Sequence, residues 1–252
     1  MDWRRLLLPG LAVLLAFLVL VSLGLWQLER RISKTIQIAA IADRAAAAPT
    51  PLPRQEGWAK AAQRSDEFRR VSVRVAFIPG REARVYAGAG GGLREDVKGP
   101  GYFAFAPARR PDGATVVVNR GYVAHLNPDA SLRPIAVPDG AIEIVGSIRF
   151  PERPSWFIPS YSDRQDLWFV RDHRAMAAHY GWGEVAPFYI EQESPRPPGG
   201  VPQPGPLTVR LRNDHFGYAM TWFGLAAVLL VSFGFWVRSR RRELSASPRR
   251  SH

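Results

Sequence analysis

Residues 6 to 28 read LLLPGLAVLLAFLVLVSLGLWQL, and residues 216 to 237 read FGYAMTWFGLAAVLLVSFGFWV. Neither run contains a charged residue, and each exceeds the roughly 20 residues that an α-helix needs to cross the hydrocarbon core of a bilayer. We therefore predict transmembrane helices over residues 6–28 and 215–237. A signal peptide is the alternative for the first run, but its apolar core is long and no small-x-small cleavage site follows promptly, which favours a retained anchor.

The charges beside these runs predict how the chain is oriented. Arg4 and Arg5 precede the first run, and six arginines with one glutamate follow the second. Positive charge beside a span marks the cytoplasmic side, so both termini are expected there. The opposite orientation would be favoured by Arg30, Arg31 and Lys34. These residues, however, begin a segment far longer than the loops to which this rule applies.

The expected organisation has five parts: a cytoplasmic tail (1–5), a span (6–28), a periplasmic mainly-β domain (29–214), a second span (215–237) and a basic cytoplasmic tail (238–252). The net charge is +12, but much of it sits in the tails and the central segment has no sustained Lys/Arg block, so nucleic acid is not an expected partner. The chain has no cysteine, which excludes disulfides and thiolate metal sites. The bias towards Arg, Ala and Pro and the lack of a transit peptide suggest a bacterial inner membrane.

Strand patterns dominate the central segment. In FRRVSVRVAF (68–77), apolar and polar residues alternate with the period of a half-buried strand. Segments rich in β-branched or aromatic residues and bounded by Gly, Pro, Asp or Asn predict further strands at 115–124, 141–150, 166–171, 187–193 and 207–213. The predicted fold class is therefore a membrane protein with two transmembrane α-helices flanking a mainly-β (α+β) domain, built as an antiparallel sheet or partial barrel.

Two helical patterns and one connector complete this organisation. Residues 29–46 carry apolar residues at helical spacing and are expected to extend the first span. Residues 171–181 predict a helix that Asp172 caps and Gly181 ends. Residues 194–207 are too rich in Pro and Gly for regular structure, which indicates an extended, ordered connector.

Local motifs for enzyme chemistry are weak. The glycine run at 87–93 lacks the Lys and Ser/Thr of a phosphate-binding loop, so a hairpin loop is the better interpretation. His173 and His179 would lie on different faces of a helix, which does not suit a zinc pair. Paired carboxylates for a hydrolase are available only among residues that are usually solvated, namely Asp163, Asp166, Glu191 and Glu193.

His215 stands out because ionisable side chains at membrane depth are costly and often functional. On a helix, His215, Tyr218, Ala219 and Trp222 share one stripe, so that an imidazole, a phenol and an indole surround a small residue. Such a stripe offers an iron ligand, stacking surface and room for a macrocycle. The alternative is an interfacial aromatic belt, with Asn213 or Asp214 capping the helix and His215 touching headgroups.

Six blocks resemble the Surfeit-locus cytochrome oxidase assembly family in their order and in the two-anchor topology. LGLWQLERR (23–31) resembles the family's G-x-W-Q-x-x-R opening, and DGATVVVNRGYV (112–123) resembles its N-R-G-W-V block, with Tyr122 in place of tryptophan and Ala124 in place of proline. The other four are FRRVSVRVAFIPGRE (68–82), PERPSWFIP (151–159), VAPFYIEQ (185–192) and HFGYAMTWF (215–223).

The resemblance implies an assembly factor for haem-copper cytochrome c oxidase, not an enzyme, that binds haem a and assists its insertion into the catalytic subunit. His215 matches the family's proposed iron ligand. The further candidate site residues are Tyr218, Thr221 and Trp222 for the pocket and Arg120 and Arg212 for the propionates. The implied partners are the oxidase catalytic subunit, the lipid bilayer and, as a further candidate, haem a synthase.

Two alternatives remain at this point. A haem-free scaffold that stabilises an oxidase assembly intermediate would need the same anchors and β domain but no obligatory His215. A tethered periplasmic hydrolase would need a nucleophile, a base and an orienting group, which these motifs do not supply together.

Overall fold

The computed structural model describes residues 4–80, 82–88, 96–97, 99–124, 136–154, 156–157, 159–207 and 213–246. The chain divides into two compact units. We call the first the helix pair (Met1–Ala39 with Leu211–His252) and the second the barrel unit (Ala40–Arg210).

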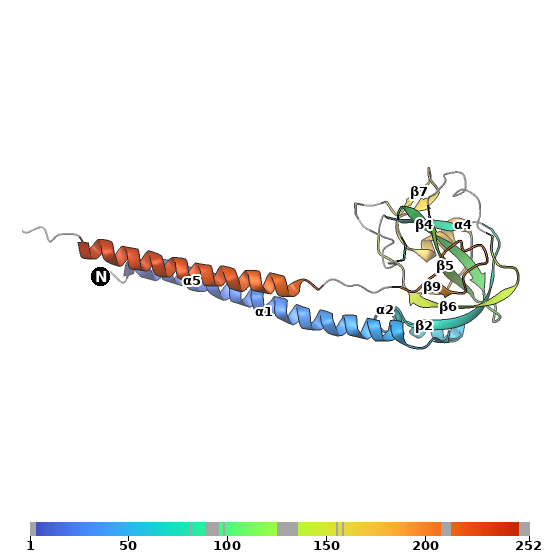
Figure 1. Ribbon diagram of the computed structural model, residues 1–252, viewed down its shortest axis with the longest axis horizontal. Helices are drawn as coiled ribbons and strands as arrows, with labels where there is room; N and C mark the ends of the chain where they lie inside the picture. The colour runs from blue at the N-terminus through green and yellow to red at the C-terminus, as the bar shows by residue number, and fades with distance from the viewer. Residues whose placement is uncertain are drawn as a thin grey trace, which may run out of the picture. The chain divides into compact units, whose positions relative to one another are not determined.

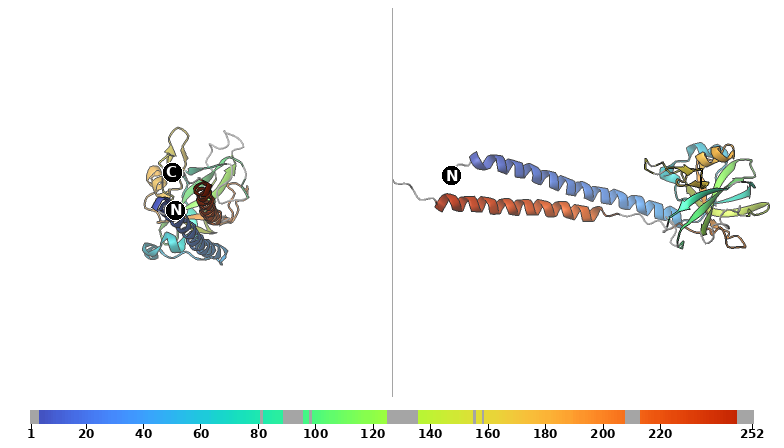
Figure 2. Two further views of the ribbon diagram at one scale, coloured as in Figure 1. Left: turned by 90° about the vertical axis from the view of Figure 1, so that its left-hand side faces the viewer. Right: turned by 90° about the horizontal axis from the view of Figure 1, so that it is seen from above.

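Two long helices form the helix pair, α1 (Arg4–Ala46) and α5 (His215–Ala246), and they run side by side (Figures 1 and 2). Both are long and apolar enough to cross a membrane. The helix α1 does not stop where its apolar run ends at Leu28 but continues to Ala46, which confirms that residues 29–46 extend the first helix.

Five strands of the barrel unit close into a barrel, with the order β2-β6-β9-β5-β4 and a return pairing of β4 with β2 (Figure 1). The β5–β9 pair is parallel and the other four barrel pairs are antiparallel. The barrel is therefore mainly antiparallel, as predicted, but mixed. Its strands are β2 (Arg70–Phe77), β4 (Gly101–Arg109), β5 (Thr115–Ala124), β6 (Ala141–Arg149) and β9 (Tyr189–Ser194).

Shorter elements extend and cover this barrel. On one side β3 pairs with β4, and β8 and β7 continue the sheet beyond it; on the other side β1 pairs with β2. The bounds are β1 (Thr50–Pro51), β3 (Ala83–Ala87), β7 (Tyr161–Ser162), β8 (Leu167–Trp168), the 3-10 helix η1 (Gln55–Lys60), α2 (Gln63–Asp66) and α4 (His173–Tyr180).

Two apolar clusters stabilise the barrel unit. The inner cluster takes Val71, Val73, Val75 and Phe77 from β2, the residues whose alternation predicted that strand. The second cluster includes Phe103, Phe105 and Tyr189 from the sheet and Met176 from α4. Because this second layer covers the outer face, several strands are buried on both sides.

Burial on both sides explains which strands the sequence pattern found. The predictions at 68–77, 115–124, 141–150 and 187–193 are confirmed by β2, β5, β6 and β9, whereas 166–171 shrinks to the two residues of β8. The pattern missed β4, in which eight of nine residues are buried and no alternation exists. Most of the predicted strand at 207–213 and most of the glycine run at 87–93 lie outside the described residues.

The helix α4 begins and ends where the sequence predicted. The Asp172 side chain accepts hydrogen bonds from the backbone N–H groups of Arg174 and Ala175, which caps the helix. Gly181 follows with φ of 70°, a left-handed conformation that glycine adopts without steric cost. Both signals are local, so no tertiary information was needed to place this helix.

Candidate functional site

His215 opens α5 and faces α1, where it meets a polar partner. Its Nδ1 atom lies 2.8 Å from Oε1 of Gln27, which is 188 positions earlier in the chain. An amide oxygen only accepts hydrogen bonds, so this contact places the ring proton on Nδ1. A neutral imidazole protonated at Nδ1 carries its lone pair on Nε2, which makes Nε2 the atom available to a metal.

Close packing between α1 and α5 makes this contact possible. A Cβ atom built on Gly24 would lie 2.5 Å from Cε1 of Phe223, so only glycine leaves space for that ring. On α5, Ala219 and Ala226 are buried as well. Small residues at such positions let two apolar helices approach closely, a pattern known from pairs of membrane helices.

A second polar contact fastens the pair near the start of α5. The Asn213 side chain donates to the backbone oxygen of Arg31 at 3.2 Å and to Oγ1 of Thr35 at 3.0 Å. The guanidinium of Arg31 lies 4.7 Å from the ring centroid of Phe216. Gln27, Arg31 and Thr35 are spaced by four residues and therefore share one face of α1. The Asn213 contacts with Arg31 and Thr35 set the register of the two helices.

The predicted stripe on α5 is divided between two environments. Tyr218 is 61% exposed, Thr221 is exposed and Trp222 is half-buried, whereas Ala219 is fully buried. The Thr221 hydroxyl donates to the Gly217 carbonyl oxygen within its own helix at 3.1 Å. Ala219 is therefore covered by the packing of α5 in the helix pair and leaves no open space for a ligand. The rings of Tyr218 and Trp222 are more exposed than Ala219.

Arg120 belongs to the barrel unit, where its guanidinium already has close partners. It donates to the Glu82 carboxylate and, at 2.6 Å, to the Ala136 carbonyl oxygen, and it lies over the ring of Phe77. With 3% of its surface exposed, Arg120 is embedded in the domain. Contact of Arg120 with a propionate stays a prediction, and Arg212 lies outside the described residues.

The residues on either side of Arg120 connect β5 to β9 and to the proline-rich segment. The Asn119 side chain donates to Glu191 at 2.8 Å and accepts from the Gly121 N–H at 3.1 Å. Gly121 has φ of 123°, and a Cβ there would lie 2.3 Å from the backbone of Gln203. The N-R-G-Y block therefore holds the proline-rich segment against β5, with two backbone hydrogen bonds between Tyr122 and Gln203.

His173 and His179 have structural surroundings. The His173 side chain is fully buried, Nε2 lies 2.9 Å from the Ala186 carbonyl oxygen, and burial lowers the pKa of His173 from 6.5 to about 4. His179 is exposed and packs beside the ring of Tyr161. Within the described residues no group of three or more His, Cys, Asp or Glu side chains is placed to hold a metal ion.

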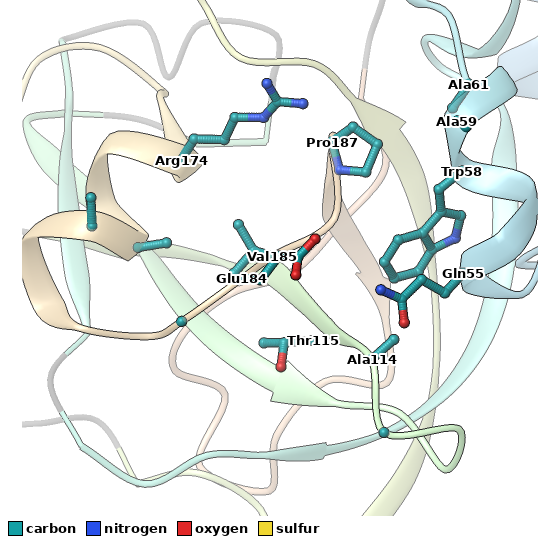
Figure 3. Close-up of a pocket in the computed structure, with 14 residues that line it drawn as sticks. Gln55, Trp58, Ala59, Ala61, Ala114, Thr115, Arg174, Glu184, Val185 and Pro187 are labelled. Atoms are coloured by element: carbon teal, nitrogen blue, oxygen red, sulfur yellow. The ribbon is translucent and has the colours of Figure 1, made fainter.

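A cleft in the barrel unit lies between η1 and α4 and has a volume of about 910 Å³ (Figure 3). Trp58 and Gln55 line one wall, and Arg174 and Glu184 approach from the other side. Most of the remaining lining is alanine and glycine, and its described residues include no histidine. The cleft thus has polar groups for a ligand but no imidazole, unlike the helix pair.

The whole stretch from inside α1 to inside α5, residues 14–227, matches the model of the SURF1 family. The chain belongs to the SURF1 family. This family is known for cytochrome oxidase assembly factors, which are not enzymes. The match includes Gln27 and His215 as well as the barrel unit, so it covers the domain and the adjoining part of each helix.

Individual relatives show the same coverage. Surfeit locus protein 1 of Homo sapiens is 31% identical over 242 residues, which span 90% of this chain and 74% of that protein. The SURF1-like protein of Drosophila melanogaster is 28% identical over 239 residues, spanning 90% and 74%. A bacterial relative, the SURF1-like protein of Rickettsia bellii, is 26% identical over 233 residues, spanning 91% and 90%.

Sequence reasoning found His215 but not its partner. The notable signal was a glutamine inside an apolar run, next to Trp26, yet the sequence could not show what Gln27 contacts. Gln27 meets His215 because the two helices pack antiparallel, although the whole barrel unit lies between them in the sequence.

Proposed function

We propose that this protein binds haem a through His215 and assists its insertion into the catalytic subunit of cytochrome c oxidase. The observation that carries the proposal is the His215–Gln27 hydrogen bond, because it orients the imidazole through Nδ1 and leaves Nε2 as the ring nitrogen available to iron. Within the described residues, Nδ1 makes the one hydrogen bond of this ring. Haem a, when bound, would supply the redox-active iron that the oxidase needs.

The surroundings of His215 fit a porphyrin better than a bare metal ion. With no cluster of three metal-ligating side chains among the described residues, an ion at His215 would have to bring most of its own ligands, as porphyrin iron does. Tyr218 and Trp222 would provide aromatic surface beside the ring. Because they lie on a helix able to cross a membrane, an apolar tail could stay in lipid while the ring is held.

We also propose the topology that this role requires. The arginines before the first span and after the second support a topology with both termini in the cytoplasm of a bacterium and the barrel unit in the periplasm. His215 opens its helix and would then lie at the periplasmic surface of the inner membrane. A haem-copper oxidase subunit in the same membrane, or a haem a synthase, could there exchange haem with it.

The test is the haem content of the oxidase in cells. Cells that produce the protein with His215→Ala should assemble cytochrome c oxidase with less haem a than wild-type cells, at equal amounts of the assembly factor in the membrane. His179→Ala, which changes an exposed histidine of the barrel unit, is the matched control and should leave haem content unchanged. Normal haem content with His215→Ala would favour the haem-free scaffold instead.

A further inference from the structure

Gln27 is a polar side chain near the end of a mainly apolar run, and it forms a hydrogen bond that joins the His215 ring to α1. Two other positions on α1 contact α5 independently of Gln27. Gly24 packs against the ring of Phe223, and Thr35 accepts a hydrogen bond from Asn213. Packing and register are thus secured on both sides of Gln27, so the His215–Gln27 contact is not needed to hold the helices together.

We infer that Gln27 is the positioning residue for His215: it fixes the proton on Nδ1 and directs Nε2 outward as the ligand atom. The inference rests on the proposed function, which it deepens. A histidine ligand commonly donates its other ring N–H to an oxygen acceptor, and this partner fixes the tautomer, the ring orientation and the basicity of the ligand. Here the acceptor comes from the other helix, so the ligand is correctly oriented only when the two helices are packed.

The choice of an amide as acceptor also has a chemical consequence. A carboxylate in the same place would draw the Nδ1 proton more strongly and make Nε2 a more basic ligand, which strengthens its bond to iron. A neutral amide orients the ring without that increase. Gln27 therefore suits a site that must hold haem firmly enough to receive it and weakly enough to release it.

The first experiment needs no haem. The full-length protein, labelled with ¹⁵N-histidine in detergent micelles, should show His215 protonated at Nδ1, with the signal assigned by its loss in His215→Ala. In Gln27→Leu the Nε2-protonated form should appear, whereas Asn213→Ala, which removes a neighbouring interhelical contact, should keep the Nδ1 form. An Nδ1 form that persists in Gln27→Leu would overturn the inference.

The second experiment measures haem a binding by absorption, with the midpoint potential as a further readout. Gln27→Leu should weaken binding by roughly 10- to 100-fold, the usual effect of removing such a partner. Gln27→Glu, of nearly the same shape, should bind more tightly and lower the midpoint potential. A merely structural role for Gln27 would not produce opposite changes in these two variants.

The outcomes separate the inference from the proposed function. If wild type binds haem, His215→Ala does not, and both Gln27 variants bind like wild type, the role of Gln27 is wrong and the proposed function stands. If wild type binds no haem in a titration where a known haem-binding protein does, both are overturned.

Discussion

Acid should destabilise the barrel unit through one histidine, His173 of α4. Its side chain is fully buried, and Nε2–H donates to the Ala186 carbonyl oxygen at 2.9 Å. Nδ1 has no hydrogen-bond partner among the described residues, so a second proton would be placed in an apolar environment against the ring of Tyr189. Burial accordingly lowers the pKa of His173 from 6.5 to about 4.

The magnitude follows from that difference in pKa. Above pH 6.5 the ring is neutral in the folded and unfolded states, and it adds no pH dependence. Between pH 6.5 and about 4 only the unfolded state takes up the proton, so stability falls as the pH is lowered. Each pKa unit corresponds to about 1.4 kcal/mol, and the loss attributable to His173 should total about 3 kcal/mol.

Chemical denaturation of the full-length protein in detergent, followed by tryptophan fluorescence between pH 7.5 and 4, would measure this loss. The free energy of unfolding of wild type should fall about 3 kcal/mol further over that range than that of His173→Gln, which keeps an N–H donor but cannot titrate. The control His179→Gln changes the exposed histidine of the same helix and should follow wild type. Equal pH dependence of wild type and His173→Gln would refute the reasoning.

Three substitutions test other parts of the structure. Gly121→Ala should destabilise the barrel unit by about 2–4 kcal/mol, because the new methyl group meets the backbone of Gln203 at a φ that alanine rarely adopts; a change below 1 kcal/mol in the same denaturation assay would contradict the close approach. Gly24→Val should displace Phe223 and return the His215 ring to the Nε2-protonated form in the ¹⁵N spectrum, whereas Gly217→Val, at a glycine with open space around it, should not. Asp172→Ala should cost about 1 kcal/mol by removing the cap of α4, and Asp172→Asn should recover most of it.

The parts of the fold that depend on local pattern could be predicted from the sequence. The apolar runs, the alternation in β2 and the Asp172 and Gly181 signals each depend on residues a few positions apart. The strand β4 was missed because α4 and its neighbours cover the outer face of the sheet, which removes the polar half of the alternation. The sequence left an antiparallel sheet and a partial barrel as alternatives. The pairing that closes the barrel joins Phe77 of β2 to Ala108 of β4, and no local pattern indicates that these two residues meet.

The candidate site divides in the same way. His215 could be predicted because its own position, at the start of an apolar helix, is unusual. Gln27 could not, since only the packing of α1 on α5 brings it to His215. Arg120 was named for its residue type and its motif, and its contacts in the structure include Glu82, Phe77 and a backbone carbonyl group, so its contact with a propionate stays a prediction.

The most direct test of haem binding by His215 is the absorption spectrum of the detergent-purified protein from a host that makes haem a, recorded beside His215→Ala. We predict a stoichiometric haem band in wild type that is absent from the variant. A colourless wild-type protein, from cells shown to contain haem a, or an equal haem band in both proteins would contradict the account.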